Sequence, residues 1–327
     1  MPFIMAWLGI EGHDTIVERF RRGLARGRLA GSYLFMGRAG VGKRTFAERF
    51  SQVLLCSEVP SEEMNPCGGC PACRQVLAGT HPDLERVSLP RDKKEIPVET
   101  LIGDRDHRSH EGFCHDLSMK PFMGGRKVGI IDDADCLNET GANCLLKMLE
   151  EPPPKSVLIL IGTSADKQLP TIRSRCQVIR FQPLAADIIA SLLVQNQVTT
   201  DPAEAQRLAQ LSDGGLTRAT HLAAEGLWEF RSDFLDCLAE TPLDTIRVIR
   251  SVSNFVEQPS KSTTAEKRQK LSLAIQTAIE FYRHTLCDNS IRCVEICLQV
   301  QSHVDRNAHV NAVIEHWLDQ LARHSAA

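Results

Sequence analysis

The sequence predicts an α/β protein with a parallel sheet, followed by an all-helical C-terminal region. Two observations predict this fold class. Up to about Phe181, short apolar runs rich in β-branched residues alternate with amphipathic segments, as buried parallel strands and their connecting helices do. Past Pro183 the strand pattern disappears and helical spacing of apolar residues takes over.

Three apolar runs are the predicted strands of the sheet. The run 32–36 leads into a glycine-rich turn, and residues 45–55 then carry apolar side chains at helical spacing. The runs 127–131 and 157–161 are the other two predicted strands. Residues 138–151 lie between them as an amphipathic helix, which Pro152 should end.

The rest of the chain is expected to be helical. Residues 185–224 predict a small helical unit interrupted at residues 213–215, and the polar segment 258–269 predicts a loop. Two apolar faces follow, Leu271, Ile275, Ala278, Ile279, Tyr282 and Leu286 on the first, and Val310, Ile314, Trp317, Leu318 and Leu321 on the second. We therefore expect three domains, residues 1–182, 183–224 and 225–327.

The composition argues against several functional classes. A net charge of -3 and a pI of about 6.4 give no global basic field for independent binding to nucleic acid. No apolar run reaches the roughly 20 residues that a membrane helix needs. The first ten residues lack the basic start and small-residue cleavage site of a secretion signal, so we expect a cytoplasmic protein that does not contact a membrane.

A phosphate-binding loop connects the first predicted strand to its helix. Residues 37–43 fit the pattern G-x-x-x-x-G-K, in which Gly37, Gly40 and Gly42 let backbone N–H groups converge on phosphate. Lys43 is expected to reach the outer phosphates. A glycine-rich turn without a ligand is the alternative interpretation.

The next position departs from the motif. A Ser or Thr hydroxyl normally holds Mg²⁺ there, but this chain has Arg44, with Thr45 one position late. One residue turns a helical side chain by about 100°. We therefore expect Thr45 not to replace the missing magnesium ligand, and hydrolysis at this site to be weak.

Acidic and hydroxyl residues follow the other two predicted strands. Asp132 could hold the metal ion through water, and Asp133 occupies the position of a water-orienting glutamate with a side chain one methylene shorter. Thr163 could contact a γ-phosphate. The alternatives are that the two acids only cap the next helix and that Thr163 forms a turn. These residues do not decide whether the site binds ATP and Mg²⁺.

Four cysteines have the spacing of a metal site. Cys56, Cys67, Cys70 and Cys73 follow the pattern C-x10-C-x2-C-x2-C, and the two glycines at 68 and 69 allow the tight turn that brings thiolates together. Four thiolates leave no open coordination position. The spacing therefore predicts a structural zinc ion rather than a catalytic metal.

These motifs, in this order, closely resemble bacterial DNA polymerase III clamp-loader subunits of the AAA+ family. The resemblance rests on the phosphate loop, the cysteine module, residues 79–83 (GTHPD), 143–153 (NCLLKMLEEPP) and 174–176 (SRC), with a looser match at 305–308 (DRNA). It implies that residues 1–182 form the AAA+ domain, 183–224 a helical lid and 225–327 an oligomerising collar. It also implies gamma/tau and delta subunits as partners, and the sliding clamp and primed DNA as partners through the complex.

The resemblance implies a role for Arg175, which on its own would be an ordinary exposed arginine. In this family the arginine of Ser-Arg-Cys reaches the ATP site of the neighbouring subunit, where a guanidinium stabilises charge on the transferred phosphoryl group. Arg44, Asp133 and the segment 214–219 (GGLTRA) resemble the delta-prime type, which keeps this arginine and loses its own site. Arg218 lies one residue from the position of the motor's sensor arginine.

Two other functions are kept as alternatives. One is a gamma/tau-like ATPase in which Thr45 or a rearranged loop binds magnesium and the chain hydrolyses ATP itself. The other is an unrelated phosphate-loop protein with a zinc knuckle.

Overall fold

The computed structural model describes residues 7–90, 93–104, 110–123, 125–223, 227–240, 243–257, 263–285, 288–305 and 308–325. The chain forms two compact units, Met1–Thr220 and His221–Ala327. The first unit contains the sheet together with most of the segment expected to be a separate lid. The division into three domains stays a prediction.

A five-stranded parallel sheet forms the centre of the first unit. Its strands are β1 (Ser32–Met36), β2 (Leu84–Val87), β3 (Lys127–Ile131), β4 (Ser156–Gly162) and β5 (Gln177–Arg180), in the order β2-β3-β4-β1-β5. The predicted α/β fold class and all three predicted strands are confirmed. Because every strand runs in the same direction, all carboxyl ends meet at one edge of the sheet and all amino ends at the other.

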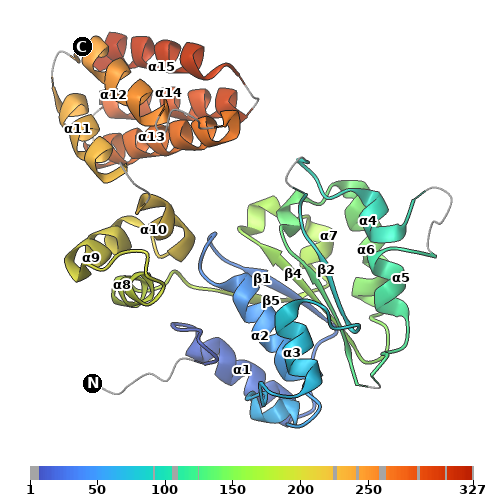
Figure 1. Ribbon diagram of the computed structural model, residues 1–327. Coiled ribbons are helices and arrows are strands. Elements are labelled where there is room, and N and C mark those ends of the chain that lie inside the picture. The colour runs from blue at the N-terminus through green and yellow to red at the C-terminus, as the bar shows by residue number, and fades with distance from the viewer. Residues whose placement is uncertain are drawn as a thin grey trace. The chain divides into compact units, whose positions relative to one another are not determined.

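Helices cover both faces of this sheet (Figure 1). One face packs against α1 (Asp14–Ala25), α2 (Lys43–Leu55) and, beside α2, α3 (Pro71–Ala78). The other packs against α4 (Val98–Ile102), α5 (Phe113–Ser118), α6 (Glu139–Glu150) and α7 (Pro170–Arg173). Three short 3₁₀ turns, Ser61–Glu63, Ala134–Cys136 and Ala165–Lys167, lie in the connections.

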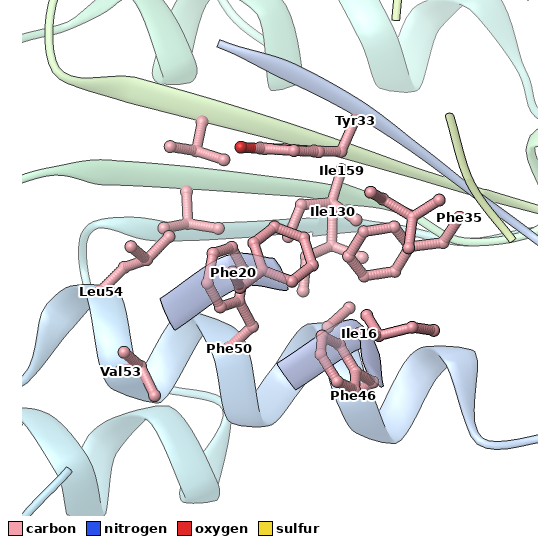
Figure 2. Close-up of a cluster of buried hydrophobic side chains, with 14 of the residues drawn as sticks. Ile16, Phe20, Tyr33, Phe35, Phe46, Phe50, Val53, Leu54, Ile130 and Ile159 are labelled. Atoms are coloured by element: carbon pink, nitrogen blue, oxygen red, sulfur yellow. The ribbon is translucent and has the colours of Figure 1, made fainter. Parts of the chain in front are cut away.

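The alternation of side chains along β1 separates the two cores. Tyr33 and Phe35 join the core under α1 and α2, whereas Leu34 and Met36 join the core on the other face. Figure 2 shows the first core, in which aromatic rings from α1, α2 and β1 pack together; the Phe20 and Phe50 ring centroids lie 4.3 Å apart. This packing holds the start of α2 firmly against the end of β1.

The amphipathic segment 138–151 forms α6, as predicted. Asn138 is its N-cap and accepts a hydrogen bond from the Gly141 amide at 2.8 Å. The helix ends at Glu150, two residues before Pro152. Three further helices complete the part of the first unit beyond β5: α8 (Ala186–Gln195), α9 (Pro202–Leu211) and α10 (Leu216–Leu222), the last crossing the boundary at Thr220.

The second unit is helical, as expected. It contains α11 (Leu227–Ala239), α12 (Thr245–Glu257), α13 (Thr264–Thr285), α14 (Asp288–Asp305) and α15 (Val310–Ser325). Nearly all of the described residues on the two predicted apolar faces are buried, with Trp317 fully enclosed. No helix in the described ranges has the length and apolar character that crossing a membrane requires.

The predicted loop at 258–269 is partly wrong. Helix α13 already begins at Thr264, because Thr263 and Glu266 form a capping box: the Thr263 amide donates to Glu266 Oε2 at 2.7 Å and the Glu266 amide donates to Thr263 Oγ1 at 3.3 Å. Residues 258–262, Leu286 and the pair 306–307 of the DRNA segment lie outside the described residues.

Candidate nucleotide and metal sites

The phosphate loop lies at the carboxyl edge of the sheet, between β1 and α2. Gly40 and Gly42 have φ values of +77° and +95°, which other residues adopt only at a cost. Gly37 is needed for a different reason, since a Cβ there would lie 2.6 Å from the Phe181 carbonyl oxygen at the end of β5. Each glycine of the motif therefore has a conformational or steric role in this fold.

Lys43 begins α2 and is buried, with only 7% of its surface exposed. Its Nζ donates to the Gly37 and Arg38 carbonyl oxygens at 2.6 and 2.7 Å. Burial lowers the pKa of Lys43, and the nearby carboxylates, Asp132 foremost, oppose that shift. The ammonium group is thus held inside the loop, next to the position where phosphates would bind.

Arg44 contacts the acidic residue that was expected to hold the metal ion. Its NH1 lies 3.3 Å from Asp132 Oδ2, and its Nε lies 3.5 Å from Glu48 Oε1. Burial raises the pKa of Asp132, and the neighbouring Asp133 carboxylate adds to this shift. Thr45, one position later, is exposed at the same cavity.

Thr163 is held by an acidic residue that sequence reasoning did not assign. Asp135 Oδ2 accepts from the Thr163 amide at 2.7 Å and from its hydroxyl at 2.6 Å, and Asp135 Oδ1 accepts from Gln168 Nε2. This links the ends of β3 and β4. The signal in the sequence was a third aspartate two residues after Asp133, but spacing alone does not show which strand end it would contact.

These residues surround a cavity of about 360 Å³. Eight of the nine predicted nucleotide-site residues line this cavity, and Gly37 does not. The complete lining is Ala39, Gly40, Gly42, Lys43, Arg44, Thr45, Asp132, Asp133, Asp135, Ile161, Gly162, Thr163, Leu216 and Thr217.

Helix α10 closes one side of the cavity. The Leu216 amide donates to the Gly40 carbonyl oxygen at 3.0 Å, and a Cβ on Gly40 would lie 2.8 Å from Thr217. Arg218, which the resemblance was expected to bring close to a sensor position, donates from NH1 to Asp213 Oδ2 at 3.0 Å and is not among the residues that line the cavity. The first turn of α10 therefore reaches the loop through Leu216 and Thr217.

Arg175 lies at the opposite edge of the sheet. It precedes β5, whose first residue Gln177 pairs with Tyr33 near the start of β1. Its guanidinium contacts Glu150, at the end of α6, with Nε and NH2 each 2.6 Å from Oε1. The length of β1, about 16 Å at 3.3 Å per residue, separates this edge from the cavity.

The four predicted metal ligands form a cluster. The Sγ atoms of Cys56, Cys67, Cys70 and Cys73 all lie within 4.8 Å of one another. The Cys56–Cys67 and Cys67–Cys73 sulfur separations are 3.7 and 3.9 Å. A tetrahedron with metal–sulfur bonds of about 2.3 Å has edges of about 3.8 Å. The donor set and its spacing therefore fit a tetrahedral metal ion that would join the end of α2 to the start of α3.

Together, the parallel sheet, the phosphate loop with its carboxyl-edge cavity and the four-cysteine cluster define a phosphate-loop α/β fold with an inserted cysteine module that could hold a metal ion. The family model for DNA polymerase III, delta subunit, matches residues 12–185, more than half of the chain. The chain therefore belongs to this family.

Individual relatives agree with this assignment. The DNA polymerase III subunit delta' of Pseudomonas aeruginosa is 35% identical over 64% of this chain and 61% of its own length; that of Bacillus subtilis is 30% identical over 62% and 57%. Subunit tau of Escherichia coli is 29% identical over 67% of this chain and 32% of its length. The chain thus spans about 60% of the length of these two delta' relatives. A gamma-subunit-related structure from Thermotoga maritima, 16% identical over 94% of this chain and 99% of its own, has a TM-score of 0.48, too low for further conclusions.

Proposed function

We propose that this chain acts as a delta'-type subunit of the DNA polymerase III clamp loader, helping to place the sliding clamp on primed DNA in the cytoplasm. In this proposal it binds gamma/tau and delta subunits, residues 183–224 act as a lid and residues 225–327 as the collar that holds the subunits together. It contacts the clamp and DNA through the complex. Family membership and the similarity to delta' subunits support this role.

The position of Arg175 carries the proposal. A guanidinium at the amino edge of the sheet, about one strand length from the chain's own cavity, is badly placed to serve that cavity. Its side chain is only 33% exposed and is oriented by Glu150, so little ordering is needed when it meets a ligand. We infer that Arg175 acts in trans on the ATP site of a neighbouring gamma/tau subunit, where it stabilises the charge that develops on the transferred phosphoryl group.

The chain's own site is proposed not to hydrolyse ATP. Arg44 contacts Asp132 on the side where a hydroxyl and a carboxylate would otherwise share Mg²⁺. The shorter Asp133 and the displaced Thr45 support the same inference. A gamma/tau-like ATPase would need those residues to rearrange.

Substitution of Arg175 tests the proposal. In a complex reconstituted with tau or gamma and delta subunits, Arg175→Ala should sharply reduce DNA-stimulated ATP hydrolysis and clamp loading, because a trans arginine commonly contributes about 10³-fold or more at the site it serves. Arg175→Lys should restore little, since lysine lacks the planar fork. Lys43→Ala should leave both activities nearly unchanged.

The matched control is Arg180→Ala, which removes an exposed arginine from the other end of β5. Gel filtration should show that every variant still enters the complex. Strong loss of hydrolysis with Lys43→Ala, or full activity with Arg175→Ala in an intact complex, would contradict the proposal.

We also propose that the cysteine cluster holds one structural zinc ion. Cys56, Cys67, Cys70 and Cys73 would supply four thiolates and leave no position for substrate. Two of these thiols, those of Cys70 and Cys73, are buried. Burial leaves little room for a substrate to approach them and favours a structural role.

A further inference from the structure

A second pocket lies beside the segment 56–73 that carries the four cysteines. Its volume is about 750 Å³, and none of its lining residues belongs to the phosphate-loop cavity. Three parts of the first unit form its wall: residues 7–8, one face of α1 and residues 63–65. The pocket is therefore separate from the candidate nucleotide site and from the cysteine cluster.

The apolar part of this wall is fixed by the fold. Val17 and Met64, which are 5% and 0% exposed, form its floor. Trp7 and Leu8 are partly buried and form one side. Trp7 Nε1 donates to the Met64 carbonyl oxygen at 2.6 Å, and the Trp7 ring centroid lies 4.9 Å from that of Phe46. The indole ring is thus already oriented, so a ligand would meet it with little loss of side-chain freedom.

Two residues of the wall have an unfavourable backbone conformation. Leu8 and Met64 have φ values of +52° and +54°, in the left-handed region that favours glycine. Residues with side chains keep this conformation only where the surrounding structure enforces it, and they cluster at active sites and ligand-binding sites. The pair therefore supports a binding role for the pocket.

Two carboxylates at the pocket lack a cation. The third, that of Glu18, is neutralised by Arg21 and Arg22, with N–O distances of 2.9 and 2.8 Å. Asp14, in the first turn of α1, and Glu63 are exposed, and within the described ranges neither has an ion pair. The pocket thus has a negative charge that a ligand can neutralise.

These groups define the chemistry of a suitable ligand. An apolar group must cover the wall, and a cation must approach Asp14 or Glu63. The methylene stem of an arginine packs on apolar surface, while its planar guanidinium binds carboxylates and stacks on an indole ring such as that of Trp7. An acidic ligand would be repelled. The wall therefore fits an arginine with a large apolar residue next to it.

We propose that this pocket docks an exposed segment of a partner protein in which an arginine lies beside a large apolar residue. A protein segment supplies both groups on one short stretch of chain, whereas a small cation supplies only the charge. This inference goes beyond the proposed function, and it holds whether or not Arg175 acts in trans.

Selection from a random heptapeptide library displayed on phage, with the full-length chain immobilised, tests the proposal. We expect enrichment of peptides in which arginine adjoins leucine, isoleucine, phenylalanine or tryptophan. The same selection on Glu63→Lys should not enrich them, because a lysine at this position repels arginine. Failure to enrich any sequence, enrichment of sequences without arginine, or equal enrichment by the two proteins would overturn the proposal.

Fluorescence titration with one enriched, dye-labelled peptide measures the affinity. Glu63→Lys should weaken binding about tenfold, since an attractive pair becomes a repulsive one. Salt at about 0.5 M should weaken binding several-fold, because the two carboxylates are exposed. Glu62→Lys, which alters an exposed neighbour outside the pocket lining, is the matched control and should bind as the unaltered chain does.

Two results of this titration would contradict the proposal. Equal loss of affinity in both lysine variants, each shown to be folded by circular dichroism, would reveal a general effect of charge and not docking at the pocket. Binding of argininamide as tight as that of the peptide would show a site for a small cation and not for a protein segment.

Discussion

At the scale of single residues, Asp83 shows how one buried carboxylate can organise a connection. Its side chain is 1% exposed, and its two oxygens accept hydrogen bonds from the Phe122 and Met123 amides at 2.6 and 2.9 Å. Both of these residues expose their apolar side chains, Phe122 to 84%. Asp83 therefore holds the backbone just before β3 in place through hydrogen bonds, although the side chains of Phe122 and Met123 are not packed in a core.

Loss of these two bonds should be costly. Asp83→Ala should lower the free energy of unfolding by about 2 to 4 kcal/mol, because two amides lose a charged acceptor. Urea denaturation followed by circular dichroism measures this change. Asp236→Ala, an exposed aspartate in the other unit, should change stability by less than about 0.5 kcal/mol. Equal effects of the two substitutions would show that the Asp83 contacts contribute little.

Residue chemistry was more predictable from the sequence than residue contacts. Lys43 and Arg44 could be placed from the phosphate-loop motif, because a strand–loop–helix unit has nearly fixed geometry, and Asp132 from the end of the strand at 127–131; all three line one cavity. Leu216 and Thr217 were missed, since their approach to Gly40 depends on how a segment about 175 residues later folds back. Asp135 was missed as the partner of Thr163, because spacing along the chain does not specify which side chains meet across two strand ends.

At the scale of elements, the cysteine cluster joins α2 to α3. Cys56 directly follows α2, and Cys70 is the N-cap of α3, where its sulfur accepts from the Cys73 amide at 3.3 Å. A metal ion bound by all four sulfurs would close the loop between these helices. Its binding energy would then be part of the stability of the first unit.

Removal of the metal should therefore destabilise that unit. We expect one zinc per chain by inductively coupled plasma mass spectrometry and a lower melting temperature after treatment with a strong chelator. Cys70→Ser should abolish stoichiometric zinc. Cys136→Ser, outside the cluster, should retain it. A full equivalent of zinc in Cys70→Ser would show that the cluster is not the metal site.

Elements with strong local patterns were predicted, and those stabilised by their neighbours were not. The fully buried strands β1, β3 and β4 are mostly apolar, whereas β2 and β5 are four-residue edge strands in which half of the residues are charged or polar. Such strands form because a neighbouring strand presents its hydrogen-bonding groups. The start of α13 was missed for a different reason: the Thr263–Glu266 capping box lies in a polar segment that resembles a loop.

At the scale of the whole molecule, the two units have separate cores. Phe50 is fully buried in the first, where it packs on Phe20. Phe234 is fully buried in the second, with its ring centroid 6.1 Å from that of Trp317. Units with independent cores commonly unfold in separate steps.

Calorimetry of the intact chain should show this independence. Phe234→Ala should destabilise the second unit by about 3 to 5 kcal/mol, as deletion of a buried aromatic ring does, and lower only one of two unfolding transitions. Phe50→Ala should lower only the other. A single transition that both substitutions shift equally would show that the units unfold as one.

The placement of Arg175 and of the cavity on opposite edges of one sheet has a consequence for assembly geometry. If one edge meets the opposite edge of a neighbour, the contact is heterologous, and every member of the series has a donor side and an acceptor side. If the cavity of one member does not hydrolyse nucleotide, that member can still supply its arginine to the next member. An arginine supplied to its own cavity by the preceding member would have no hydrolysis to accelerate. Under the proposed role of Arg175, such a chain would mark where a directional series begins, so that a closed assembly built from similar folds would acquire a defined starting point.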